Sequence, residues 1–179
     1  MPASHPPAGA PPARSAAFRA HDHEACRAAA LRAAQAACAG SGAGRLTPAR
    51  RRVLEILLES HAALGAYEIL DRLRAEGRNA RPPAAYRALD FLVAQGLVHR
   101  IERLNAFVAC AFPGRDHAPA FLVCRACRRV AETAAPGAVA ELDAAAGRAR
   151  FALESLSLEA EGLCPECAPR QGPRQEERP

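Results

Sequence analysis

The chain has 179 residues and a net charge of +5, and its 24 basic residues are all arginine because it contains no lysine. This length suits one medium domain or two small ones, and the positive charge favours a nucleic-acid partner. No apolar stretch is long enough to span a membrane, and residues 1–14 lack the apolar segment of a secretory signal. We therefore expect a cytoplasmic protein with no membrane partner.

Four helices are predicted in the first half of the chain, after an arm over residues 1–20 that is expected to be disordered. The first helix is alanine-rich, covers 22–39 and is stopped by glycines. The second begins at Thr47-Pro48, where threonine is a good N-cap and proline suits the first turn. Gly65 can cap the third, whose apolar face comprises Ala66, Ile69, Leu70 and Leu73.

The fourth helix begins at Pro82-Pro83 and ends at Gly96, and a stripe of apolar residues runs along it. The stripe comprises Ala85, Ala88, Leu89, Leu92 and Val93. Tyr86 and Arg87 lie off this stripe and near the N-terminus, where a recognition helix presents side chains to the major groove of DNA. A solvated helix face is the alternative, and for these two residues taken alone it is the better one.

After Gly96 the pattern changes to strands over 97–102 and 107–111, joined by a four-residue loop. This loop would place His99 directly opposite Cys110. Helices followed by such a hairpin describe a winged helix.

The second half is predicted to hold strands over 118–124 and 130–133, a helix over 138–146 and a last strand over 151–158. The fold is therefore α+β. A winged-helix domain over 21–111 is joined by a hinge over 112–118 to a small α/β domain over 119–169, and 170–179 form a disordered tail.

Two Cys-x-x-Cys pairs stand in the second half: Cys124-Arg-Ala-Cys127 and Cys164-Pro-Glu-Cys167. Together they provide four thiolates, the number that a tetrahedral Zn²⁺ site needs, and such a site has no open position for catalysis. The alternatives are two disulfides or two redox dithiols. We expect structural zinc, because two such pairs rarely occur together for another reason. The gap of about 36 residues between the pairs is expected to hold a small folded unit, whose two ends the metal ties together.

A second set of potential ligands lies around the hinge: His99, Cys110, His117 and Glu132. Two imidazoles, one thiolate and one carboxylate are a suitable set for tetrahedral zinc. Each residue also has an ordinary interpretation. His99 could be a packed core histidine, Cys110 a buried thiol, His117 an exposed loop histidine and Glu132 a strand charge. Taken singly, these interpretations are the better ones.

Several motifs resemble the ferric uptake regulator superfamily, and the match is closest to its zinc uptake regulator branch. Residues 81–92 and 95–99 are similar to the recognition helix and the wing of that family. Residues 45–50 and 66–70 are similar to its second and third helices, and the two cysteine pairs match its structural zinc site. Ala84-Ala85 departs from the Thr-Val that usually precedes the Tyr-Arg pair.

The resemblance implies a dimeric, zinc-responsive repressor of zinc-uptake genes that binds palindromic operator DNA. We expect the protein not to be an enzyme, because a zinc deaminase needs a His-x-Glu beside its metal and none of the six histidines has a glutamate two positions on. The resemblance also implies two zinc ions per chain and no small-molecule substrate. The regulatory zinc would be held by His99, Cys110, His117 and Glu132, and DNA contacts would fall on Tyr67 and Arg87. The alternatives are an iron or peroxide sensor of the same superfamily, or a thiol redox switch.

The remaining histidines and cysteines receive ordinary interpretations. His21 and His23 are weighed as an extra metal site, but a solvated position without function is favoured. Cys26 and Cys38 are interpreted as packing residues of the first helix, and His61 as a surface residue.

Overall fold

The computed structural model describes residues 16–40, 44–78, 81–114 and 117–168. Residues 1–15 of the expected arm and the expected tail lie outside the described residues. The first half contains the 3₁₀ turn η1 (Ala16–Phe18), the helices α1 (His23–Gly40), α2 (Pro48–Leu57), α3 (Ala66–Ala75) and α4 (Pro82–Ala94), and the strands β1 (Val98–Ile101) and β2 (Ala106–Ala109). The second half contains β3 (Pro119–Cys124), β4 (Val130–Ala134), α5 (Pro136–Arg148) and β5 (Leu158–Gly162).

Helices α2, α3 and α4 begin where the cap residues and prolines predicted them. Thr47 caps α2, its side chain accepts a hydrogen bond from the Arg50 amide, and Pro48 occupies the first turn. Gly65 is the N-cap of α3, and the Glu68 carboxylate accepts from its amide at 2.6 Å. Prolines open α4. These signals are local, so they do not depend on how the rest of the chain folds.

Helices α1 to α4 pack around one hydrophobic core. Four of the five predicted stripe residues of α4 are buried: Ala85, Ala88, Leu89 and Leu92. Val93 is 39% exposed, so its assignment to the stripe was wrong. Each residue advances about 100° around a helix, and position 93 turns past the face that packs against α2 and α3.

The β1–β2 hairpin has a different register from the predicted one. His99 pairs with Val108, and the Cys110 amide donates to the Leu97 carbonyl instead of lying opposite His99. A 3₁₀ turn over Glu102–Leu104, followed by Asn105 in the left-handed region (φ 43°), closes the hairpin with Ile101 opposite Ala106. The shift is two residues, so His99 and Cys110 still share one face of the hairpin.

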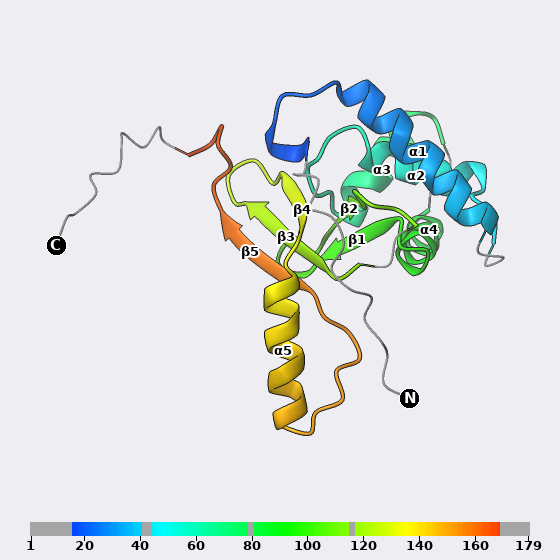
Figure 1. Ribbon diagram of the computed structural model, residues 1–179. Helices are drawn as coiled ribbons and strands as arrows, with labels where there is room; N and C mark the ends of the chain where they lie inside the picture. The colour runs from blue at the N-terminus through cyan, green and yellow to red at the C-terminus, as the bar shows by residue number, and fades with distance from the viewer. Residues whose placement is uncertain (1–15, 41–43, 79–80, 115–116, 169–179) are drawn as a thin grey trace.

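The second half is a three-stranded sheet in the order β4-β3-β5, with α5 connecting β4 to β5. Strand β3 is antiparallel to β4 and parallel to β5. In Figure 1, α5 projects away from the sheet, and the chain returns alongside it before β5 begins. The predicted strand over 151–158 was wrong, because residues before Leu158 have no strand partner and pairing begins at Leu158 opposite Ala120.

The two halves share a second hydrophobic core. It joins residues of the β1–β2 hairpin to residues of β3 and β4, and includes Ile101, Val108, Phe121, Val123 and Val130. Polar contacts add to it, since the Glu159 carboxylate accepts from the Glu102 and Arg103 amides at 2.7 and 3.1 Å. No helix in the described ranges is long and apolar enough to cross a membrane.

Candidate metal centres

The four paired cysteines meet at one edge of the three-stranded sheet. Cys124 ends β3 and Cys164 follows β5, and parallel strands finish at the same edge, so both pairs are brought together. The four sulfur atoms lie within 4.8 Å of one another. All seven cysteines are free, so the interpretation as two disulfides is not what the structure contains.

The spacing within this cluster, Cys124, Cys127, Cys164 and Cys167, suits a tetrahedral ion. The sulfurs of Cys127 and Cys164 are 3.7 Å apart. A tetrahedron with metal–sulfur bonds of ~2.3 Å has edges of ~3.8 Å. The Cys164 amide also donates to the Cys124 sulfur at 3.3 Å, a contact that stabilises a thiolate. The residues therefore fit a closed four-thiolate zinc site.

The thiols of this cluster differ in acidity because they share protons and backbone donors. Burial acts against ionisation of Cys124, but backbone N–H groups, first that of Cys164, lower the pKa of this thiol to about 6. Hydrogen bonds with Cys164 and Cys127 raise the pKa of Cys167 to about 12. A cation at the centre would replace these shared protons.

The second predicted set, His99, Cys110, His117 and Glu132, also comes together. Its ligand atoms lie within 4.8 Å of one another. His99 is on β1, Cys110 follows β2, His117 lies just before β3, and Glu132 is on β4. Glu132 Oε1 is 2.6 Å from His117 Nε2 and 3.2 Å from His99 Nε2, and the Cys110 sulfur is 3.7 Å from His117 Nε2.

Two features of this set suit it to hold a cation. His99 Nε2 is buried, and its approach to Glu132 does not have hydrogen-bond geometry, so it has no hydrogen-bond partner among the residues that the structure describes. Glu132 is only 4% exposed and is the one buried charged residue among those that the structure describes, so it is not an ordinary strand charge. The set of two imidazoles, a thiol and a carboxylate fits zinc.

Burial and charge set the protonation of this site without metal. Burial, followed by the nearby Glu132 carboxylate, raises the pKa of the Cys110 thiol to about 12. Burial also acts against ionisation of Glu132, but contacts with His99 and the Ala111 amide lower the pKa of this carboxyl below its usual value. Glu132 is therefore ionised and Cys110 is a thiol at neutral pH.

The predicted DNA-contact residues lie on an exposed face of the first half. Tyr67, on the first turn of α3, is 66% exposed, and Tyr86, near the start of α4, is 43% exposed. Both line one surface hollow together with Arg100 and Arg128. Arg87 is also exposed. The structure brings the two tyrosines together beside basic side chains.

Cys38 is buried in the helical core, as expected of a packing residue. Two other residues, Cys26 and His61, depart from their ordinary interpretations. Cys26 instead lies with His21, His23 and His61, and the four ligand atoms are within 4.8 Å of one another. His61 is half-buried, so its assignment to the surface was wrong. The spacing His21-x-His23-x-x-Cys26 was the available signal in the sequence, but the fourth member is distant along the chain.

The described residues form a winged helix joined to a small α/β sheet, with clusters of potential metal ligands at the sheet edge and at the junction. Comparisons with known proteins agree with this class. Residues 42–161 match the Ferric uptake regulator family. The Zinc uptake regulation protein of Escherichia coli (strain K12) is 41% identical over 124 residues, which cover 69% of this chain and 72% of that protein.

Solved structures give the same result. Holo XcZur superposes with a TM-score of 0.70 at 40% identity, covering 76% of this chain and 95% of that chain. A zinc uptake regulator in complex with zinc and DNA superposes with a TM-score of 0.74 at 38% identity, covering 79% and 94%. The chain belongs to the ferric uptake regulator family, as the sequence motifs predicted.

Proposed function

We propose that this protein is a zinc-responsive transcriptional repressor. As a homodimer with two zinc ions per chain, it binds palindromic operator DNA and represses genes for zinc uptake. The observation that carries the proposal is the convergence of His99, Cys110, His117 and Glu132 to within 4.8 Å at the junction of the two halves. Relatives named as zinc uptake regulators support zinc as the metal.

Cys124, Cys127, Cys164 and Cys167 are assigned to structural zinc. They tie the ends of β3 and β5 together and leave no open coordination position. The role of this site is to hold the second half folded, since zinc binding to such a site contributes directly to folding.

His99, Cys110, His117 and Glu132 are assigned to the regulatory zinc. His99 and Cys110 belong to the hairpin, which is the wing, and Glu132 belongs to the sheet of the second half. Residues 112–118, which include His117, act as the hinge between these two units. Binding of one ion by all four side chains favours a single arrangement of the two halves, the one that is competent to bind DNA.

The energy available is sufficient for such a switch. Shifting the competent arrangement from about 1% to 99% of molecules requires about 5.5 kcal/mol of differential binding. Structural zinc sites provide roughly 10–16 kcal/mol of binding free energy at neutral pH. A fraction of that energy is enough to control operator binding.

DNA binding is assigned to the exposed face of α3 and α4, with Tyr67, Tyr86 and Arg87 as contacts. A net charge of +5 favours a polyanionic partner. The zinc uptake regulator solved with zinc and DNA, 38% identical, supports this partner. Operator DNA as the target also implies a position in the cytoplasm.

The homodimer is assigned to the second half of the chain. Large apolar side chains are exposed there on β3, on α5 and on the segment before β5: Leu122, Leu142, Phe151 and Leu153. Two copies that join through this half by a two-fold axis present both recognition helices to one duplex. Half-sites one helical turn apart, ~34 Å, then give a pseudo-palindromic operator.

The protein is not an enzyme in this proposal. Both predicted zinc sets fill four coordination positions with protein ligands, whereas catalytic zinc retains a position for water or substrate.

The test is operator binding by the full-length protein under buffered free zinc. A fluorescence anisotropy titration with promoter DNA of zinc-uptake genes should show binding that appears as free zinc rises and is lost on chelation. Fe²⁺ under anaerobic conditions and peroxide are the comparison treatments. Control of binding by Fe²⁺ or by oxidation, with no response to zinc, would contradict the proposal.

A further inference from the structure

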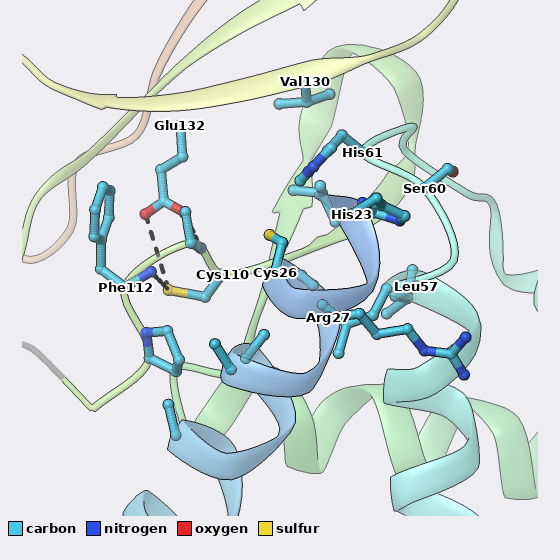
Figure 2. A pocket seen from close by; sticks show the side chains of 18 residues that line it. His23, Cys26, Arg27, Leu57, Ser60, His61, Cys110, Phe112, Val130 and Glu132 are labelled. Atoms are coloured by element: carbon cyan, nitrogen blue, oxygen red, sulfur yellow. Dashed lines mark hydrogen bonds between the residues drawn. The ribbon is translucent and has the colours of Figure 1, made fainter. Parts of the chain in front are cut away.

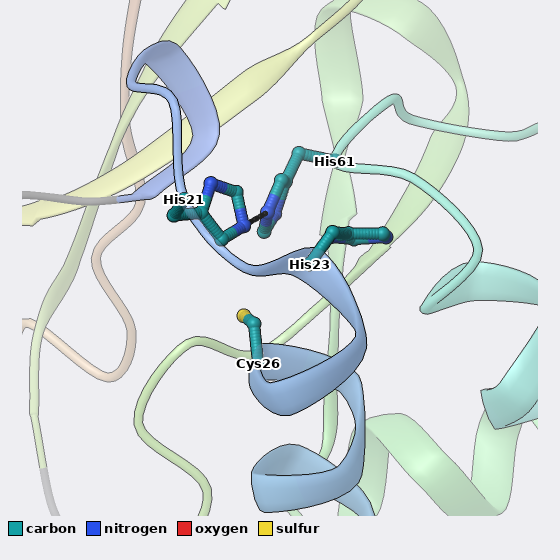
Figure 3. A group of neighbouring side chains, drawn as sticks. All are labelled: His21, His23, Cys26 and His61. Atoms are coloured by element: carbon teal, nitrogen blue, oxygen red, sulfur yellow. Dashed lines mark hydrogen bonds between the residues drawn. The ribbon is translucent and has the colours of Figure 1, made fainter.

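Three histidines and one cysteine that take no part in the proposed function come together at the start of α1. His21 precedes the helix, His23 begins it, Cys26 lies in its first turn, and His61 is in the loop between α2 and α3. Figure 3 shows the Cys26 thiol pointing towards the space beside the His21 and His61 rings, with His23 next to them. We propose that these four residues form a third metal site, for zinc or a similar borderline divalent cation.

The distances within this cluster are those of a metal site. His21 Nε2 and His61 Nε2 are 3.1 Å apart, and all four ligand atoms are within 4.8 Å of one another. Two imidazoles on a tetrahedral zinc with Zn–N bonds of ~2.05 Å have nitrogens ~3.3 Å apart. The rings are 5.0 to 5.5 Å apart between centroids and inclined by 50° to 83°, so they are not stacked. Their edges converge instead.

Hydrogen bonds on the far side of two rings orient them for binding. His21 Nδ1 is 2.9 Å from the Arg19 carbonyl, and His23 Nε2 is 3.0 Å from the Glu59 carbonyl. In each ring the nitrogen that faces a carbonyl must carry the proton, so the other nitrogen presents its lone pair. Metal-binding histidines are held in this way by backbone carbonyls.

The backbone positions His23, Cys26 and His61 before any ion binds. His23 and Cys26 are three residues apart on α1 and therefore share one face of the helix. The Asp22 carboxylate accepts from the Ala25 amide at 3.0 Å and so caps this first turn. The His61 carbonyl accepts from the Val130 amide at 2.9 Å, which anchors the loop to β4.

The donor set determines which metals fit. One thiolate and three neutral imidazoles suit Zn²⁺, Co²⁺, Ni²⁺ and Cu²⁺, whereas Mg²⁺ and Ca²⁺ require oxygen ligands. Three histidines in contact also repel one another when protonated, and a cation held by their lone pairs removes the need for protons at the centre.

The position of this site gives it a role distinct from the other two. His23, Cys26 and His61 line a cavity of about 490 Å³ that Cys110 and Glu132 also line (Figure 2). An ion held by the four residues would join the first turn of α1 to the loop that is anchored on β4. The third metal would therefore fix α1 over the cavity beside the regulatory set.

Zinc counting on the full-length protein tests the proposal. Wild type, Cys26→Ser, His21→Ala and His61→Ala are dialysed against a series of buffered free-zinc concentrations, and bound zinc per chain is measured. Cys38→Ala is the matched control, because Cys38 lies on the same helix but in the apolar core. We expect each cluster variant to bind one equivalent less than wild type, and Cys38→Ala to bind the same number.

Two further measurements separate this site from the regulatory set and from damage to the fold. Cys26→Ser combined with Cys110→Ser should lose one equivalent more than Cys110→Ser alone. Hydrogen exchange in the first turn of α1 should slow when zinc is added to wild type and Cys38→Ala, but not in the cluster variants. Because His21 is exposed, His21→Ala leaves packing intact. The proposal is overturned if His21→Ala and Cys26→Ser retain the zinc count of wild type, or if the double variant loses no more than Cys110→Ser.

Discussion

His117 Nε2 lies 2.6 Å from Glu132 Oε1, and this contact joins the segment before β3 to the middle of β4. The carboxylate oxygen that His117 contacts also lies 3.2 Å from the buried His99 nitrogen. One carboxylate thus gathers side chains from both halves around a common centre.

Replacing a cysteine of the four-thiol cluster should unfold the second half. Cys164→Ala removes one of four ligands, so we expect the loss of one zinc per chain, a lower melting temperature and loss of the dimer. Metal analysis, thermal denaturation and sedimentation measure these effects. Cys38→Ala, which removes a thiol outside every cluster, should keep the zinc content and the dimer. A Cys164→Ala protein with unchanged zinc, melting and mass would contradict the structural assignment.

Replacing a ligand of the second set should remove regulation but not the fold. Cys110→Ser and His117→Ala should each remain folded dimers with one zinc per chain fewer than wild type, and neither should bind the operator when zinc is added. The reason is that each variant loses the ion that favours the DNA-competent arrangement. Operator titrations with and without zinc measure the effect. A normal zinc response in either variant would show that these residues are not the sensor.

Replacing Arg87 should weaken DNA binding. Arg87→Ala should cost about 1–3 kcal/mol in operator affinity if its guanidinium contacts a base, with relaxed specificity at that position. A phosphate contact would instead weaken binding evenly across sequences and reduce the salt dependence. Arg148→Ala, on α5 and remote from α4, is the control and should bind as wild type. Full affinity in Arg87→Ala would place the DNA-reading face elsewhere.

Zinc binding by the second set should strengthen as pH rises. Burial raises the pKa of the metal-free Cys110 thiol to about 12, so the thiol must release its proton when zinc binds. The lowered pKa of Glu132 keeps this carboxylate ionised, so it adds no further proton. Affinity should therefore increase about tenfold per pH unit between pH 7 and 9.

Competition titrations with a chromophoric chelator at several pH values measure this slope. The four-thiol cluster is kept loaded throughout, so the chelator competes only for zinc that is bound outside this cluster. Any zinc that Cys110→Ser still takes up at this site at high zinc concentration should be bound more weakly and with a shallower pH dependence, because serine has no proton to release in this range. An affinity that stays constant between pH 7 and 9 would show that Cys110 is not a ligand.

Local chemistry made the helices predictable from the sequence. Thr47 with Pro48, and the prolines that open α4, fix helix starts through their own backbone preferences. The face of α4 followed from helical periodicity, apart from Val93 at its margin. The meeting of the two cysteine pairs was predictable, because each short spacing places two thiols where one ion could bind both.

Long-range pairing explains the features that the sequence did not reveal. The hairpin register depends on the left-handed conformation of Asn105, and the start of β5 depends on its parallel pairing with β3. The burial of Glu132 depends on packing between the two halves. His61 joins Cys26 only because the loop after α2 is bridged to the strand that begins at Val130. Each of these requires contacts between residues that are distant in sequence.

The parallel pairing of β3 and β5 gives the four-thiol cluster a further property. An ion bound there cross-links two points of the chain separated by about 40 residues. Closing a loop of this length lowers the conformational entropy of the unfolded state, which on a chain-entropy basis stabilises the folded state by about 4 kcal/mol. The closed loop contains β4, α5 and β5, but none of the helices α1 to α4. Metal removal should therefore destabilise the second half more than the helical first half. A partly unfolded form, in which helices α1 to α4 remain folded, should then appear between the native and the fully unfolded states.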